Sequence, residues 1–307
     1  MKGAIDVWCN PFTPEGIKHL FIDNEEVHFM MGTQWGRTHH MVGYSVKDFV
    51  KQMDELGVEK VCIPALKQAF YRKNKMGGDF QYQDIAKVCA EAPDRVIGFF
   101  GINPFDRMQG VRDLERAVKE FNFQGAHVHP FGFGLPINAA EWFPFYAKCA
   151  ELDIPVVFQV GHSAEFMPSA CGKPILLDDI ALYFPELKLI GGHTGWPWVE
   201  ELIAMAWKHP NVYICCSGHA PKYWDKKLVH FLNSRGKGKV VWGTDYPLIL
   251  HKESLQQIDA LNLKPEAKQA LLHDTAAKIF KWDQSEPETG KKAAKSAKAK
   301  RDGIQVL

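Results

Sequence analysis

Several hydrophobic runs of this sequence end at a histidine or an aspartate, and both residue types can bind metal ions or transfer protons. The four residues in such positions are Asp6, His162, His193 and Asp245. Buried strands of a parallel sheet read as continuous apolar runs, and α/β proteins keep their chemistry at the carboxyl ends of those strands. Any one of the four could be structural, as Asp245 would be in an ordinary turn. Together, at one rim, they predict a shared catalytic site and therefore an enzyme.

Eight segments of strand length position these residues. They are residues 3–8, 60–65, 96–101, 125–130, 155–161, 188–193, 212–217 and 239–244. Segments with helical spacing lie between them, and the first of these, Ser45–Gly57, begins with an approximate capping box of Ser45 and Asp48. Eight strands alternating with helices in 307 residues predict an α/β fold, a (β/α)8 TIM barrel, with extra C-terminal helices near 253–261 and 265–280. An open doubly wound sheet is the alternative, although the chain has no glycine-rich nucleotide-binding motif.

The connection after the first strand is unusually long. Residues 9–44 precede the first expected helix and are rich in Phe, Met, Trp and His. A long connection at the catalytic end of a barrel is typically a lid or a wall of the substrate site. An equally weighted alternative is that residues 9–44 pack on the surface or form a contact within a homo-oligomer.

Composition limits the class of protein. The net charge of +1 argues against a nucleic-acid partner, and no segment is apolar for long enough to cross a membrane. Seven cysteines without a C-x-x-C pair fit the reducing cytoplasm. Of the 37 basic and 36 acidic residues, six and three lie in residues 284–307, which leaves 31 and 33 in the remainder. We therefore expect a catalytic barrel domain over residues 1–283 and a basic, flexible tail over residues 284–307.

Four motifs together resemble the amidohydrolase-related family, in the branch that includes aminocarboxymuconate-semialdehyde decarboxylase. They are Gly125–Pro130, Ile154–His162, Gly192–Trp198 and Gly243–Pro247, and Thr275–Phe280 is similar to the closing helix of the family. The order and spacing of the motifs cover nearly the whole predicted barrel.

The resemblance implies a divalent ion, zinc or manganese, and a set of ligands. Carried over to this sequence, the ligands are Asp6, His162 and Asp245, and His193 would polarise a substrate carbonyl or move a proton. Trp8 stands where a second ligand from the first strand is expected, and indole cannot ligate a metal. Asn10, on the same face of an extended strand, could compensate.

Substrate contacts are expected from other residues near the same rim. They are His127 and His129 on the fourth strand, Trp8, Arg37 and His219, with His127 equally well placed as a core residue. Histidines in predicted helices are expected at the surface, namely His209, His230, His251 and His273.

The preferred reaction is hydrolysis of a small carbonyl compound, with an aryl group or a β-keto acid or thioester. In this hypothesis Asp245 takes the proton of a metal-bound water, and the hydroxide attacks a carbonyl polarised by His193. Two alternatives stay open. One is nonoxidative decarboxylation of an aromatic or unsaturated acid, as in aromatic catabolism, and the other is a barrel that binds a ligand without a metal.

Overall fold

Eight parallel strands form a nearly closed barrel in the computed structural model, which describes residues 2–283. The strands are β1 (Ala4–Asp6), β2 (Val58–Pro64), β5 (Val96–Gly101), β6 (Gly125–Val128), β7 (Val156–Phe158), β8 (Leu189–Gly191), β9 (Val212–Cys215) and β10 (Val240–Val241). They pair in that order. The first and last strands meet through a bridge between Cys9 and Tyr246 and through the Val7 N–H, which donates to the Trp242 carbonyl at 3.0 Å. The predicted TIM barrel is confirmed, with most strands shorter than the apolar runs.

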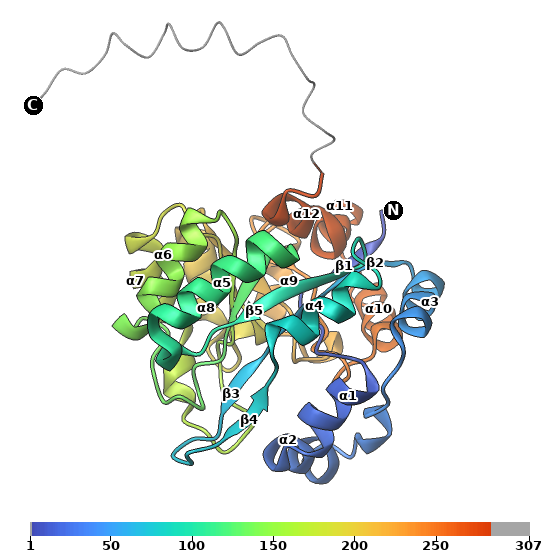
Figure 1. Cartoon of the computed structure of the whole chain (residues 1–307). Helices are drawn as coiled ribbons and strands as arrows, with labels where there is room; N and C mark the ends of the chain where they lie inside the picture. The colour runs from blue at the N-terminus through green and yellow to red at the C-terminus, as the bar shows by residue number, and fades with distance from the viewer. Residues whose placement is uncertain (1, 284–307) are drawn as a thin grey trace, which may run out of the picture.

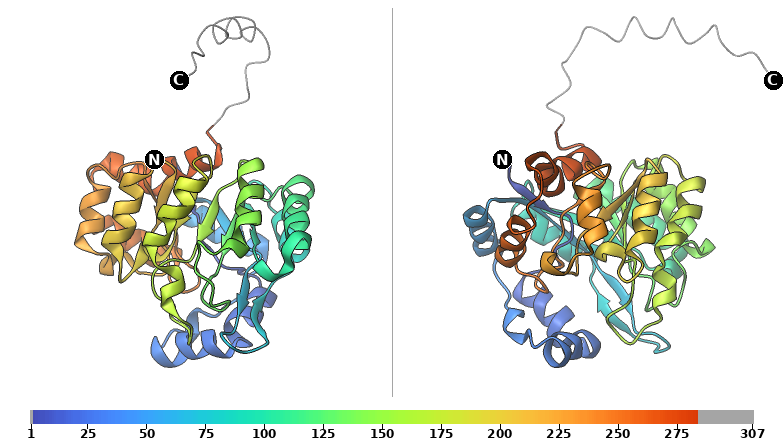
Figure 2. Two further views of the ribbon diagram at one scale, coloured as in Figure 1. Left: turned by 90° about the vertical axis from the view of Figure 1, so that its left-hand side faces the viewer. Right: turned by 180° about the vertical axis from the view of Figure 1, so that it is seen from behind.

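Helices surround the barrel (Figures 1 and 2). They are α1 (Pro14–Ile17), α2 (Glu25–Phe29), α3 (Val46–Leu56), α4 (Tyr82–Ala90), α5 (Arg107–Phe121), α6 (Phe143–Glu151), α7 (Leu177–Tyr183), α8 (Val199–Lys208), α9 (Lys226–Leu232), α10 (His251–Asp259), α11 (Pro265–Gln269) and α12 (Thr275–Phe280). The expected cap of α3 is present, because the Asp48 N–H donates to Ser45 Oγ at 3.1 Å. The predicted helix over 265–280 is interrupted by a π-helical turn at Ala270–Asp274.

Side chains of the strands alternate between two apolar layers, as a barrel requires. The inner layer fills the barrel with residues such as Ile5, Val157, Ile190 and Val241. The outer layer lies between the strands and the helices. Both layers are buried, which is why the strands read as continuous apolar runs.

The long connection forms a cap, defined here as residues 14–40, over the carboxyl ends of the strands. It contains α1, α2 and two π-helical turns, Lys18–Ile22 and Met30–Gln34. An antiparallel hairpin that was not predicted, β3 (Lys67–Ala69) and β4 (Met76–Asp79), lies beside it. In Figure 1 the cap and the hairpin are at the end of the molecule opposite to α11 and α12.

Within residues 2–283, no helix combines the length and the apolar character needed to cross a membrane. All seven cysteines are free thiols and buried. The tail predicted over residues 284–307 lies outside the described residues.

Candidate active site

A cavity of about 590 Å³ lies between the cap and the carboxyl ends of the strands. The cap contributes an apolar wall that includes Leu20, Phe21, Val27 and Met30. The segments that follow the strands contribute polar groups: Asn10, Gln159, His162, His193, His219 and Asp245. An apolar wall with a few convergent polar groups is typical of small-molecule sites.

Asp245 is held by its backbone conformation and by two side-chain hydrogen bonds. Its φ of 58° lies in the left-handed region, which a residue with a side chain seldom adopts and which often marks a functional site. Its Oδ1 accepts the indole N–H of Trp8 at 2.9 Å and the amide N–H of Asn10 at 2.7 Å. Burial raises the pKa of Asp245 to about 7, although the two hydrogen bonds oppose the shift. The side chain is 15% exposed.

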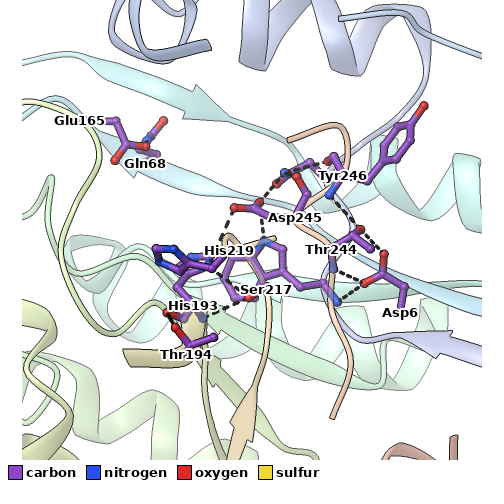
Figure 3. A network of polar contacts seen from close by, with 12 residues as sticks. Asp6, Gln68, Glu165, His193, Thr194, Ser217, His219, Thr244, Asp245 and Tyr246 are labelled. Carbon is purple, nitrogen blue, oxygen red and sulfur yellow. Dashed lines mark hydrogen bonds and ion pairs between the residues drawn. The ribbon is translucent and has the colours of Figure 1, made fainter. Parts of the chain in front are cut away.

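His193 lies beside Asp245, with its Nδ1 3.9 Å from Asp245 Oδ2 (Figure 3). The same nitrogen is 3.1 Å from Ser217 Oγ, which also accepts the backbone N–H of His193. Burial lowers the pKa of His193 to about 4, so the imidazole is neutral at neutral pH. The two predicted catalytic residues are therefore brought together as a protonatable carboxyl and a neutral imidazole.

Asp6 is placed elsewhere. Its carboxylate accepts hydrogen bonds from the backbone N–H groups of Trp8 and Thr244, each at 3.0 Å, and from the Thr244 hydroxyl. Asp6 Oδ2 also lies 2.8 Å from Nε2 of His251, a histidine predicted at the surface but buried. In Figure 3 Asp6 lies next to Thr244, whereas Asp245 is the acid near His193.

The predicted metal ligands Asp6, His162 and Asp245 are thus not brought together. β1 ends at Asp6 and Val7 forms a bend, so the alternation expected to align positions 6 and 8 stops there. Asp6 does not line the cavity; its carboxylate links the first strand, β1, to Thr244, which follows the last strand, β10.

The groups around Asp245 do not fit a divalent ion. Trp8 and Asn10 direct N–H donors at its Oδ1, where a metal ion would need a lone pair. Its Oδ2 faces His193, but among residues 2–283 no two further His, Cys, Asp or Glu ligand atoms lie close enough to share an ion with it. Within residues 2–283, one group of three His, Cys, Asp or Glu residues has ligand atoms close enough to share an ion, namely Asp6, Cys9 and His251. It is buried, and both oxygens of Asp6 already accept hydrogen bonds.

The other predicted contacts divide into two sets. His162, His219 and Arg37 line the cavity, whereas Trp8, His127 and His129 are buried beside it without lining it. Burial lowers the pKa of His219 to about 4. Arg37 Nη1 donates to the Leu248 carbonyl at 2.6 Å.

Among the described residues, neither ring nitrogen of His127 has a hydrogen-bond partner. It packs edge-on against Trp8, with the ring centroids 4.5 Å apart. The reading of His127 as a barrel-core residue therefore fits better than a substrate contact.

Sequence reasoning missed a polar group at the cavity wall. Glu165 accepts the side-chain N–H of Gln68 and the hydroxyl of Ser163, each at 2.9 Å. Gln159 also lines the cavity and directly follows the last residue of β7, so its position at a strand end could have indicated it. Gln68 and Glu165 lie in irregular or unpredicted segments and gave no such signal.

The comparisons with known proteins agree with the motifs. The sequence model of the amidohydrolase family matches residues 5–282. Gamma-resorcylate decarboxylase of Rhodococcus jostii is 22% identical over 317 residues, which cover 85% of this chain and 95% of the relative. The 2-amino-3-carboxymuconate-6-semialdehyde decarboxylase of Dictyostelium discoideum is 24% identical over 199 residues, which cover 54% and 55%.

A solved structure supports the fold. The dihydroxybenzoic acid decarboxylase of Polaromonas sp. JS666, with bound manganese and the inhibitor 2-nitroresorcinol, matches with a TM-score of 0.69 and 20% identity. The match covers 93% of this chain and 99% of that structure.

Proposed function

The chain belongs to the amidohydrolase family, and from this premise we propose that it removes the carboxyl group of an aromatic or unsaturated acid as carbon dioxide. The observation that carries the proposal is that Asp245 lines the cavity with a carboxyl whose pKa is raised to about 7. At neutral pH a large fraction of Asp245 is protonated and can deliver its proton. Decarboxylation needs this, because a proton must replace the lost carboxyl group on carbon.

The hydrogen bonds of Asp245 determine where its proton lies. Oδ1 accepts two N–H groups, so the proton of the neutral carboxyl is on Oδ2, the oxygen that faces His193. In the proposed reaction Asp245 protonates the ring carbon that bears the carboxylate. The bond from that carbon to the carboxylate then breaks, its electron pair stays on the ring, and carbon dioxide leaves. In this proposal the neutral imidazole of His193 accepts a hydrogen bond from a substituent hydroxyl of the substrate.

The cavity suits such a substrate. Leu20, Phe21 and Met30 offer an apolar surface for a ring, and Arg37, His162 and His219 supply N–H donors for an acidic group. The decarboxylases among the relatives support the same class of substrate. Hydrolysis by a metal-bound water has less support, because the predicted ligands Asp6 and Asp245 do not share a site.

The experiment is a panel of aryl acids, including 2,6-dihydroxybenzoate and 5-carboxyvanillate, incubated with the full-length protein in heavy-oxygen water. We expect carbon dioxide in equal amount to a decarboxylated product that carries no label. The Asp245→Asn variant, which keeps the size of the side chain but cannot donate an acidic proton, should lose turnover by about 10²–10⁴-fold. A carboxylic acid product that contains the heavy oxygen would instead indicate hydrolysis.

A further inference from the structure

Both N–H donors on Asp245 Oδ1 come from the segment after β1. The donors are Trp8 Nε1, at 2.9 Å, and Asn10 Nδ2, at 2.7 Å. Indole N–H is a donor without an acceptor site, and the amide nitrogen of Asn is likewise only a donor. Their hydrogens point to the side of Asp245 where a cation bound to Oδ1 would have to lie.

Neither donor is free to turn away. Asn10 Nδ2 also donates to the Tyr246 carbonyl at 2.9 Å. The ring of Trp8 is held between the imidazoles of His127 and His193, at centroid distances of 4.5 and 4.9 Å. The Trp8 carbonyl in turn accepts the backbone N–H of Asp245 at 2.7 Å, so the two residues fix each other.

Within residues 2–283, Asp245 has no cationic partner, and its Oδ2 belongs to no group of three His, Cys, Asp or Glu ligand atoms close enough to share an ion. Its one ion-pair contact within residues 2–283 is with His193, whose imidazole is neutral near pH 7. Another carboxylate, Asp6, is tied to Thr244, the neighbour of Asp245 in the chain. The two N–H groups are therefore the interactions that can stabilise a negative charge on Asp245.

We infer that Asp245 works without a divalent ion, and that Trp8 and Asn10 are positioning residues whose N–H groups take the place of the cation. They direct the other oxygen, Oδ2, toward His193. They also stabilise the carboxylate that remains after proton transfer. The first part of the inference, that Asp245 binds no ion, holds whatever the reaction is. The second part, that the N–H groups stabilise the carboxylate after proton transfer, rests on the proposed function.

Metal analysis of the full-length protein tests the first part. Protein from cells grown with added zinc and manganese, purified without chelator, should carry no ion that depends on Asp245. Manganese titrated into the apoprotein should leave the melting temperature unchanged, and a chelator should leave turnover unchanged. About one equivalent of zinc or manganese that is present in the wild type and lost in Asp245→Asn would overturn the inference.

The role of the donors is tested by infrared spectroscopy, which does not require a substrate. The C=O band of the protonated Asp245 side chain is identified as the band missing in Asp245→Asn. Trp8→Phe removes one donor to Oδ1 and should move this band to higher frequency. The matched control is Trp242→Phe, because Trp242 is equally buried but donates to Ser254 Oγ, at 2.9 Å. An unmoved band in a folded Trp8→Phe protein would overturn the role of Trp8.

Discussion

At the level of single residues, burial shifts the acid and the base of the cavity floor in opposite directions. Removal from water disfavours the charged form of each group, so the pKa of Asp245 rises to about 7 and that of His193 falls to about 4. Between these values both side chains are neutral. Neither group then places an unpaired charge in the buried cavity, which would cost free energy.

This pair predicts a bell-shaped dependence of kcat/KM on pH. Asp245 acts as an acid, so activity should fall as pH rises through about 7 and the carboxyl loses its proton. Activity should also fall as pH decreases through about 4, because His193 then becomes charged. The measurement is kcat/KM from pH 3.5 to 9 with the substrate found by carbon dioxide release, within the range where the protein stays folded. If activity instead increases as pH rises through 7, the ionised carboxylate of Asp245 is required, and Asp245 acts as a general base.

At the level of elements, the loop after β9 fixes the position of His193, which lies on the loop after β8. Gly218 has a φ of 71°, and a Cβ added there would lie 2.6 Å from His193 Nδ1. Ser217 in the same loop contacts that nitrogen at 3.1 Å. The position of His193 therefore depends on the absence of a side chain at residue 218.

Gly218→Ala should reduce turnover strongly while the protein stays folded, because the methyl group displaces the imidazole of His193. The matched control is Gly57→Ala. Gly57 has a φ of 70°, but no atom of the part of the chain that the structure describes lies within 4 Å of the added Cβ. Both variants should lose about 1–2 kcal/mol of stability from left-handed backbone strain. Thermal melting and kcat separate the two effects, and equal activity losses in both variants would refute a specific role for Gly218.

The sequence was sufficient to predict the eight barrel strands, but not the β3–β4 hairpin, the helices of the cap or every side-chain direction. The eight strands were visible because each is buried on both faces, and Ser45 marked the start of α3. The direction of the Asp6 side chain could not be predicted, because it depends on where β1 ends and on contacts with Thr244 and His251, more than 200 residues away in the chain. The same holds for the bond from Trp8 to Asp245, which forms only when the barrel closes.

At the level of the whole molecule, two parts of the structure line the cavity. Its polar floor comes from segments after the barrel strands, which are fixed by parallel pairing over the whole sheet. Its apolar wall comes largely from the cap, residues 14–40, whose side chains pack with Leu66 and Leu248. The chemistry therefore depends on the barrel, while the fit of an apolar substrate depends on the cap.

This division predicts which parts of the chain a bound substrate protects from hydrogen exchange. In the inactive Asp245→Asn variant, a saturating aryl acid substrate should slow exchange of backbone amides in the cap, because Leu20, Phe21, Val27 and Met30 line the cavity. The internal control is the opposite end of the molecule, α11 and α12, where exchange should stay unchanged (Figure 1). Exchange followed by mass spectrometry with and without the substrate gives the comparison. If the substrate slows exchange only in the barrel loops and leaves residues 14–40 unaffected, the cap is not a wall of the substrate site.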